Sequence, residues 1–301
     1  MSLSGIFPVL PTPFDESGAP DEASLRKLVR YVVASGADGA TYPGVASEVG
    51  ELTVDERLHL VDVVQDELRG QLPLIVGISS TDAETSAMLG RAAQKRGAAA
   101  FMVAAPADRK DTDAQVAFFR ELARGLSAPI MLQNVPPPAG AGLTPQTLLP
   151  ILEAVPAIAY VKEETLPSGQ RLTQIRERAP ASLLAVFGGA GGRYVTDELR
   201  RGAAGSMPAI ELAEVHAKLM AAHRAGDEAR VRDLFTRMLP ILNVQAVFRW
   251  ALTKYVLQRR GIIAHAGQRA AGPSFDEFDR ADVDAFLADI ADLLLSGDAI
   301  P

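Results

Sequence analysis

The chain has 301 residues, which is long for one ordinary domain but normal for an α/β barrel with an appendage. Hydrophobic residues make up 48% of it and charged residues 22%, enough to build a large core. The formal net charge of −7 argues against nucleic acid as the main partner, because phosphate binding needs a basic face.

The chain contains no cysteine, which excludes disulfides and thiolate metal sites. Its N-terminus lacks the basic start and apolar run of a signal peptide. No segment reaches the roughly 18 uninterrupted apolar residues that would span a membrane. We therefore expect a soluble, cytoplasmic protein without membrane contact.

Short apolar runs alternate with longer amphipathic segments along most of the chain. Runs that are continuously apolar, without polar alternation, indicate strands buried on both faces, as in a parallel sheet. In chain order, strands are predicted at residues 6–10, 39–42, 74–76, 99–104, 130–132, 158–161, 183–187 and 205–207.

The segments between these runs carry helix start and stop signals. A hydroxyl followed three residues later by Glu or Gln is a capping-box spacing, which satisfies free amides at a helix start. This spacing occurs at Thr53 and Glu56, Thr81 and Glu84, and Thr112 and Gln115. A basic residue followed by glycine, as at Arg69-Gly70 and Arg201-Gly202, suits a helix end.

Strands and helices alternate through about residue 225, which predicts a (β/α)8 barrel carrying the active site in residues 1–225. An open doubly wound sheet is the alternative. It often has a glycine-rich first turn, whereas the first turn here is Pro11-Thr12-Pro13. That turn cannot cradle a phosphate with amides.

The strand pattern stops after Gly226. Residues 227–260 and 276–296 are predicted to be helical, with Gly272-Pro273 as a break between them. No linker separates this part, so residues 226–301 are predicted to form a helical region packed on the barrel.

Lys162 is the only one of the six lysines that ends a strand of buried character; the other five, Lys110 and Lys254 included, lie in amphipathic or loop segments where solvation is expected. In a (β/α)8 barrel, catalytic side chains project from the carboxyl ends of strands. An amine there loses solvation, which favours the neutral form able to attack a ketone. The alternative is a structural ion pair with Glu163, Glu164 or, across the barrel mouth, Glu48.

Three further loops follow predicted strands. Small residues at 44–48 would let backbone amides approach a carboxylate, and Ser47 can donate a hydrogen bond. Gln133 would point an amide into the mouth, ahead of a stiff proline run. The glycine-rich loop at 188–192 could hold an anion or be only a tight turn.

The sequence gives little support for a metal site or for a nucleophilic serine. The four histidines lie in helical or appendage segments without metal-ligand spacing, and no Gly-x-Ser-x-Gly motif occurs. We expect no metal and no organic cofactor, which leaves covalent catalysis by lysine.

The motifs, in order and spacing, resemble the dihydrodipicolinate synthase/N-acetylneuraminate lyase superfamily nearly end to end. They are the opening segment 5–14, the loop 44–48, Asn134-Val135-Pro136, Gly140 and Val161-Lys162-Glu163. The resemblance implies a barrel with C-terminal helices, usually a homotetramer, and a Schiff base on Lys162 with a small 2-oxo acid. Substrate contacts are expected at Pro8, Ala46, Ser47, Glu48, Gly189 and Met207.

The departures narrow the expected substrate. The family's two threonines before Glu are Val45 and Ala46, its proton-relaying tyrosine is Gln133, and the arginine of the synthase matches Pro138. These differences argue against lysine biosynthesis. The remaining pattern resembles 2-keto-3-deoxy-L-arabonate dehydratase-like members.

The sequence therefore predicts a class I lyase, a dehydratase of a 2-keto-3-deoxy sugar acid. Lys162 is the expected nucleophile, and Ser47, Gln133 or Glu163 the expected proton-transfer group. A pyruvate-dependent aldolase of the same superfamily, dihydrodipicolinate synthase included, is one alternative. A non-catalytic 2-oxo-acid-binding protein is the other.

Overall fold

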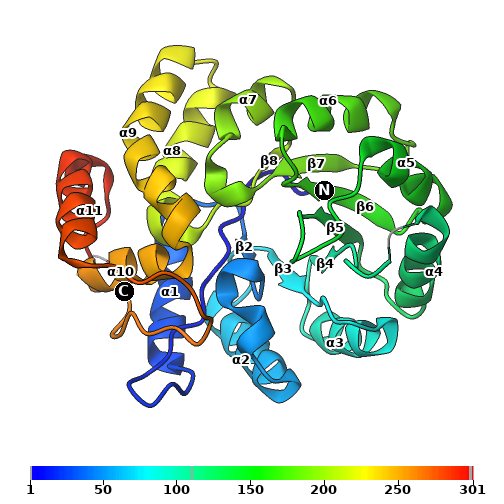
Figure 1. Ribbon diagram of the computed structural model, residues 1–301, viewed down its shortest axis with the longest axis horizontal. Coiled ribbons are helices and arrows are strands. Elements are labelled where there is room, and N and C mark those ends of the chain that lie inside the picture. Colours follow the sequence, from blue (N-terminus) through cyan, green and yellow to red (C-terminus); the bar gives the residue numbers. More distant parts are fainter. Residues whose placement is uncertain (1, 110, 298–299, 301) are drawn as a thin grey trace.

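The computed structural model describes residues 2–109, 111–297 and 300, so Lys110 and the last part of the predicted helical region lie outside the described residues. Eight parallel strands form one curved sheet in the order β1-β8-β7-β6-β5-β4-β3-β2. Val9 bridges both Thr41 and Ala209, which brings the two ends of the sheet together. Helices surround the strands (Figure 1). The predicted (β/α)8 barrel is confirmed.

The strands lie at or near the predicted apolar runs, and several are shorter. The first run, predicted at 6–10, forms regular strand only at its start, because Pro8 has no amide hydrogen to donate to a neighbour. The eight strands are β1 Gly5–Ile6, β2 Ala40–Thr41, β3 Leu74–Gly77, β4 Ala100–Ala104, β5 Ile130–Asn134, β6 Ile158–Glu163, β7 Ala185–Gly188 and β8 Gly205–Ser206.

Eight α-helices alternate with the strands. Thr53 and Glu56 form the predicted capping box at the start of α2. The next two helices are capped instead by Asp82 and Asp111, where a carboxylate accepts the amide three residues on. The helices are α1 Glu22–Ala34, α2 Val54–Leu68, α3 Ala83–Lys95, α4 Thr112–Ala123, α5 Pro145–Ala154, α6 Ser168–Arg178, α7 Val195–Arg200 and α8 Ala213–Arg224.

The C-terminal helices are α9 Glu228–Phe248, α10 Trp250–Arg259 and α11 Glu277–Asp289. The single helix predicted at 227–260 is wrong, since Arg249, at φ 47° and ψ −112°, interrupts it. The predicted break at Gly272-Pro273 lies in the non-helical stretch before α11. Helix α9 packs against α8, α10 and α11, and these helices lie together on one side of the barrel (Figure 1). The exact division at residue 225 stays a prediction.

Side chains that alternate along the strands build two layers of core. One set fills the barrel, where Phe7 and Phe187 meet edge to face with ring centroids 5.8 Å apart. The other set packs between strands and helices. This alternation decides which polar side chains at the strand ends face the inside. Within the described part of the chain, no helix has the length and apolar character needed to cross a membrane.

Candidate active site

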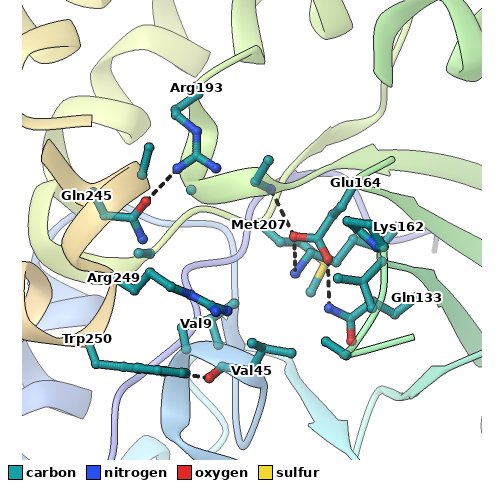
Figure 2. A pocket seen from close by; sticks show the side chains of 18 of the residues that line it. Val9, Val45, Gln133, Lys162, Glu164, Arg193, Met207, Gln245, Arg249 and Trp250 are labelled. Atoms are coloured by element: carbon teal, nitrogen blue, oxygen red, sulfur yellow. Dashed lines mark hydrogen bonds and ion pairs between the residues drawn. The ribbon is translucent and has the colours of Figure 1, made fainter. Parts of the chain in front are cut away.

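A cavity of about 370 Å³ lies at the carboxyl ends of the strands. Its wall includes the ends of β5 and β6, the proline-rich loop after β5, the short 3₁₀ segments η1 Val45–Ser47 and η3 Ala190–Gly192, and the junction of α9 with α10. Figure 2 shows these side chains converging on one space. This is where (β/α)8 barrels place their catalytic groups.

Lys162 enters this cavity from β6 and is only 4% exposed. Its Nζ lies 3.3 Å from Oε1 of Glu164. Of the three carboxylates considered as its ion-pair partner, Glu164 is the one the structure brings to it. The pair lines the cavity wall, so the amine keeps an approach for a ligand.

Glu164 is held in place by three donors. Besides Lys162, Gln133 donates from Nε2 to its Oε2 at 2.7 Å, and the amide of Ala190 donates to its Oε1 at 2.9 Å. Burial acts to raise the pKa of Glu164, but the charge of Lys162 and these hydrogen bonds together keep it below its ordinary value. At Gly189, an added Cβ would stand 2.5 Å from Oε1 of Glu164, so the close approach of this loop requires glycine.

Glu163 points away from the cavity, which corrects its prediction as a proton-transfer group. Its carboxylate accepts from Nδ2 of Asn134 at 2.8 Å and pairs with Arg171 at 3.3 Å, between strand and helix. Burial raises its pKa, against the opposing charge of Arg171. Strand alternation is the reason: Lys162 faces in, the next residue faces out, and Glu164 faces in again.

Ser47 is also assigned differently by the structure. Its hydroxyl donates to the carbonyl of Leu10 and accepts from the amide of Gly44 at 2.8 Å, and the side chain is fully buried. It lies outside the lining of the Lys162 cavity. Ser47 therefore fixes the loop after β2 and is not placed for proton transfer or for side-chain contact with substrate.

Glu48 does not reach the substrate cavity either. It forms a fully buried ion pair with Lys254 of α10 at 2.5 Å, and the amides of Arg269 and Ala270 both donate to it at 2.7 Å. This corrects two predictions, because Lys254 was expected to be solvated. The pair joins the β2 loop to the C-terminal region.

The other predicted contacts are divided. Ala46 and Met207 line the cavity, as does Gln133, which was predicted for proton transfer. Pro8 and Gly189 do not line it, whereas Val9, the neighbour of Pro8, does. Pro8 instead accepts the amide of Thr41 through its carbonyl.

Several polar lining residues were not predicted from the sequence, among them Arg193, Gln245, Arg249 and Trp250. The last three lie at the junction of α9 with α10, and no local pattern marks them, because only tertiary packing brings this junction to the barrel mouth. Strand alternation, by contrast, could have found Glu164. Among the described residues, no group of three potential metal-ligating side chains occurs.

This arrangement offers a buried amine beside a single carboxylate. An amine can attack a ketone, and a neighbouring carboxylate can take up and return protons within the same cavity. Gln133 fixes the orientation of that carboxylate, so proton transfer would be directed toward atoms bound to Lys162.

Comparison with known proteins gives relatives over nearly the whole chain. A 4-hydroxy-tetrahydrodipicolinate synthase of Acidobacterium capsulatum is 32% identical over 81% of this chain and 81% of that protein. An L-2-keto-3-deoxyarabonate dehydratase of Azospirillum brasilense is 28% identical over 97% and 96%. The crystal structure of a dihydrodipicolinate synthase from Rhodopseudomonas palustris has a TM-score of 0.87 and 26% identity, covering 95% of this chain and 97% of that one.

Residues 2–288 match the sequence model of the dihydrodipicolinate synthetase family. The barrel, the C-terminal helices and the lysine at the end of the sixth strand agree with this match. The chain belongs to the dihydrodipicolinate synthetase family and is a lyase.

Proposed function

We propose that the protein is a Schiff-base dehydratase of a 2-keto-3-deoxy sugar acid. The observation that carries this proposal is the pair of Lys162 and Glu164 inside the cavity, with Nζ and Oε1 3.3 Å apart. A nucleophilic amine and one proton-transfer carboxylate are the two groups that dehydration next to a ketone needs.

The reaction begins when the neutral amine of Lys162 attacks C2 and water is lost, which forms an iminium ion. The iminium acidifies C3, and Glu164 takes the C3 proton to give an enamine. The enamine electrons form the C3–C4 double bond as the C4 hydroxyl departs, and Glu164 returns its proton to that hydroxyl so that water leaves. Hydrolysis of the conjugated iminium releases Lys162 and an unsaturated 2-oxo acid, which can tautomerise.

The iminium itself accepts electrons in this scheme, so the reaction requires no organic cofactor or metal. Ala46, like Lys162, lies on the cavity wall, where the η1 backbone can receive the C1 carboxylate. Glu164 replaces the family tyrosine as proton carrier, with Gln133 at the tyrosine position orienting it.

A pyruvate-dependent aldol condensation is the second candidate, favoured by the relatives named as 4-hydroxy-tetrahydrodipicolinate synthase. Against it stands Pro138 on the cavity wall, at the position where the resemblance calls for an arginine. Proline offers no donor to a second substrate's carboxylate. Dehydration is therefore the preferred proposal.

Borohydride trapping combined with product analysis tests this proposal. The protein is incubated with 2-keto-3-deoxy sugar acids, treated with borohydride and mapped by peptide mass spectrometry; a reduced adduct on Lys162 is expected. Without borohydride, a 2-oxo acid of unchanged carbon number indicates dehydration, whereas free pyruvate indicates cleavage. No adduct with any sugar acid or with pyruvate would refute the Schiff-base mechanism.

The homotetramer and the cytoplasmic location stay predictions. Light scattering of the purified protein tests the first, and fractionation of the source cells tests the second.

A further inference from the structure

Two arginines stand at the cavity with no carboxylate bound to them. Arg193, just after η3, and Arg249, between α9 and α10, both line the cavity. Among the described residues, neither forms a salt bridge; Arg193 donates to Oε1 of Gln245 at 2.6 Å, and Arg249 lies over the ring of Trp250 at 4.5 Å. In Figure 2 the side chain of Arg249 extends toward the side of the cavity that holds Lys162, and the guanidinium group of Arg193 lies beside Gln245.

The position of Arg249 is tightly determined. Its φ of 47° and ψ of −112° are rare for a residue with a side chain, and such strain persists only where the surroundings enforce it. The next residue, Trp250, donates from its indole nitrogen to the carbonyl of Val45 at 2.8 Å. The ring under Arg249 is thus anchored to η1, which lines the same cavity as Lys162.

The charges of the lining residues do not balance without a ligand. Lys162, Arg193 and Arg249 are cationic, and Glu164 is the single carboxylate among the lining residues. With Lys162 as an iminium, the lining carries a formal charge of +2, since three positive groups face one negative group. The C1 carboxylate of a 2-oxo acid removes one positive charge and leaves one for a second anion. Burial raises the pKa of Glu211 to about 7, so this nearby carboxyl compensates Arg193 only in part at neutral pH.

We infer that Arg249, supported by Arg193, binds a second carboxylate at the far end of the substrate, so that the substrate is a 2-keto-3-deoxy sugar diacid. This inference rests on the proposed function and adds the chemistry of the far end. Arginine suits the role because its planar fork binds carboxylates in two parallel hydrogen bonds. The two arginines approach from η3 and from the C-terminal helices, away from the β5 and β6 strand ends that present Gln133 and Lys162.

Two ligands that share the 2-oxo acid group and differ at the far end test whether a second carboxylate is bound. 2-Oxoglutarate and 2-oxopentanoate have the same carbon chain and differ only in a terminal carboxylate or methyl group. We expect borohydride trapping on Lys162 to reach half-saturation at a concentration at least tenfold lower with 2-oxoglutarate. Arg249→Gln should reduce this preference by roughly ten- to a hundredfold, the range for a lost charge-assisted contact. Arg249→Lys should be intermediate.

Two further variants control for indirect effects. Arg193→Gln tests the supporting charge independently of the strained backbone at Arg249 and should also reduce the preference. Arg178→Gln removes an exposed arginine of α6 that does not line the cavity and should leave the preference unchanged. Equal trapping of both acids by the native protein would overturn the inference. If Arg249→Gln weakened the trapping of both acids equally, the inference would also be overturned, because the arginine would then bind the C1 carboxylate that both acids share.

Calorimetric binding to Lys162→Ala protein separates this inference from the proposed function. That variant cannot form the Schiff base, yet it should still prefer 2-oxoglutarate, and the added Arg249→Gln change should abolish the preference. If no adduct forms on native protein while this preference persists, the Schiff-base proposal fails and the anion site stands. If adducts form without any preference, the anion site fails and the chemistry stands.

Discussion

Two buried lysine–glutamate pairs lie near the barrel mouth, and their surroundings differ. Lys162 and Glu164 border the cavity, 3.3 Å apart, and the carboxylate is shared with Gln133 and Ala190. Lys254 and Glu48 lie 2.5 Å apart with both side chains fully inaccessible. Lys254 also donates to the carbonyl of Gly267 and lies over the ring of Phe14.

The comparison shows that burial of a lysine does not by itself indicate catalysis. The ammonium of Lys254 is bound by Glu48 and by the carbonyl of Gly267, and it lies outside the lining of the cavity. Burial lowers its pKa, and the charge of Glu48 opposes that change. Lys162 keeps an open face toward the cavity. Access to a ligand separates the pair that we propose to be reactive from the structural one.

The largest expected effect comes from removing the cavity lysine. Lys162→Ala should lower product formation by at least about 10³-fold, because no other lysine of the described residues lines the cavity to form the covalent intermediate. Thermal unfolding should change less than on loss of Lys254, because Glu164 borders the cavity and keeps two of its donors, whereas Glu48 is fully buried. Rates are measured by product chromatography. Turnover at the native level in this variant would show that Lys162 is not the nucleophile. The two lysine–glutamate pairs would then not differ in catalytic role.

Replacing the carboxylate of the cavity pair separates adduct formation from proton transfer. Glu164→Gln should lower turnover by roughly 10²–10⁴-fold while pyruvate can still be trapped on Lys162. The matched variant is Glu163→Gln, which alters the neighbouring carboxylate on the outer face of β6. It should affect stability more than turnover. If Glu163→Gln were the more damaging change for turnover, the assignment of the inward carboxylate would be wrong.

Breaking the second pair should act on stability. Lys254→Met leaves the carboxylate of Glu48 buried without its cation, which costs about 3–5 kcal/mol of unfolding free energy in comparable pairs. Urea unfolding measures this loss. Adding Glu48→Gln removes the uncompensated charge and should restore part of the stability, as expected for residues in direct contact. Additive losses in the double variant would mean that the two groups do not stabilise each other.

The smallest expected effect is a pH dependence of stability that comes from Glu198, a buried carboxyl group near the cavity pair. Glu198 accepts from the hydroxyl of Ser168 at 2.7 Å, and its pKa is raised from 4.5 to about 7, first by burial and also by Glu164 and Glu163. The native state therefore holds this proton more tightly than the unfolded chain. The stabilisation is complete below about pH 4.5 and is lost as pH rises to about 7.

Glu198→Gln removes this titration. Its melting temperature should therefore fall less than that of the native protein between pH 5 and 7.5, roughly the window set by the two pKa values. Thermal unfolding followed across this range gives the comparison. Identical slopes for the two proteins would show that Glu198 is ionised equally in the folded and unfolded chain.

Local patterns in the sequence predicted the architecture well, because buried strands and helix caps depend on residues that are close together in the sequence. Lys162 was accessible to the same reasoning, since it ends an apolar strand. The sequence reasoning selected Ser47, Gln133 or Glu163 for proton transfer, whereas the alternation of the strand, continued by two residues, places Glu164 beside Lys162. The positions of Lys254 and Arg249 depend on how the C-terminal helices dock, which no local pattern encodes.

The hydrogen bond from Trp250 to Val45 joins residues 205 positions apart. During synthesis, the strand that carries Lys162 leaves the ribosome well before α10 does, so for that interval the growing chain has its amine but lacks one wall of the cavity. A chain released early would likewise lack that wall. Synthesis through α10 is thus a condition for closing the cavity.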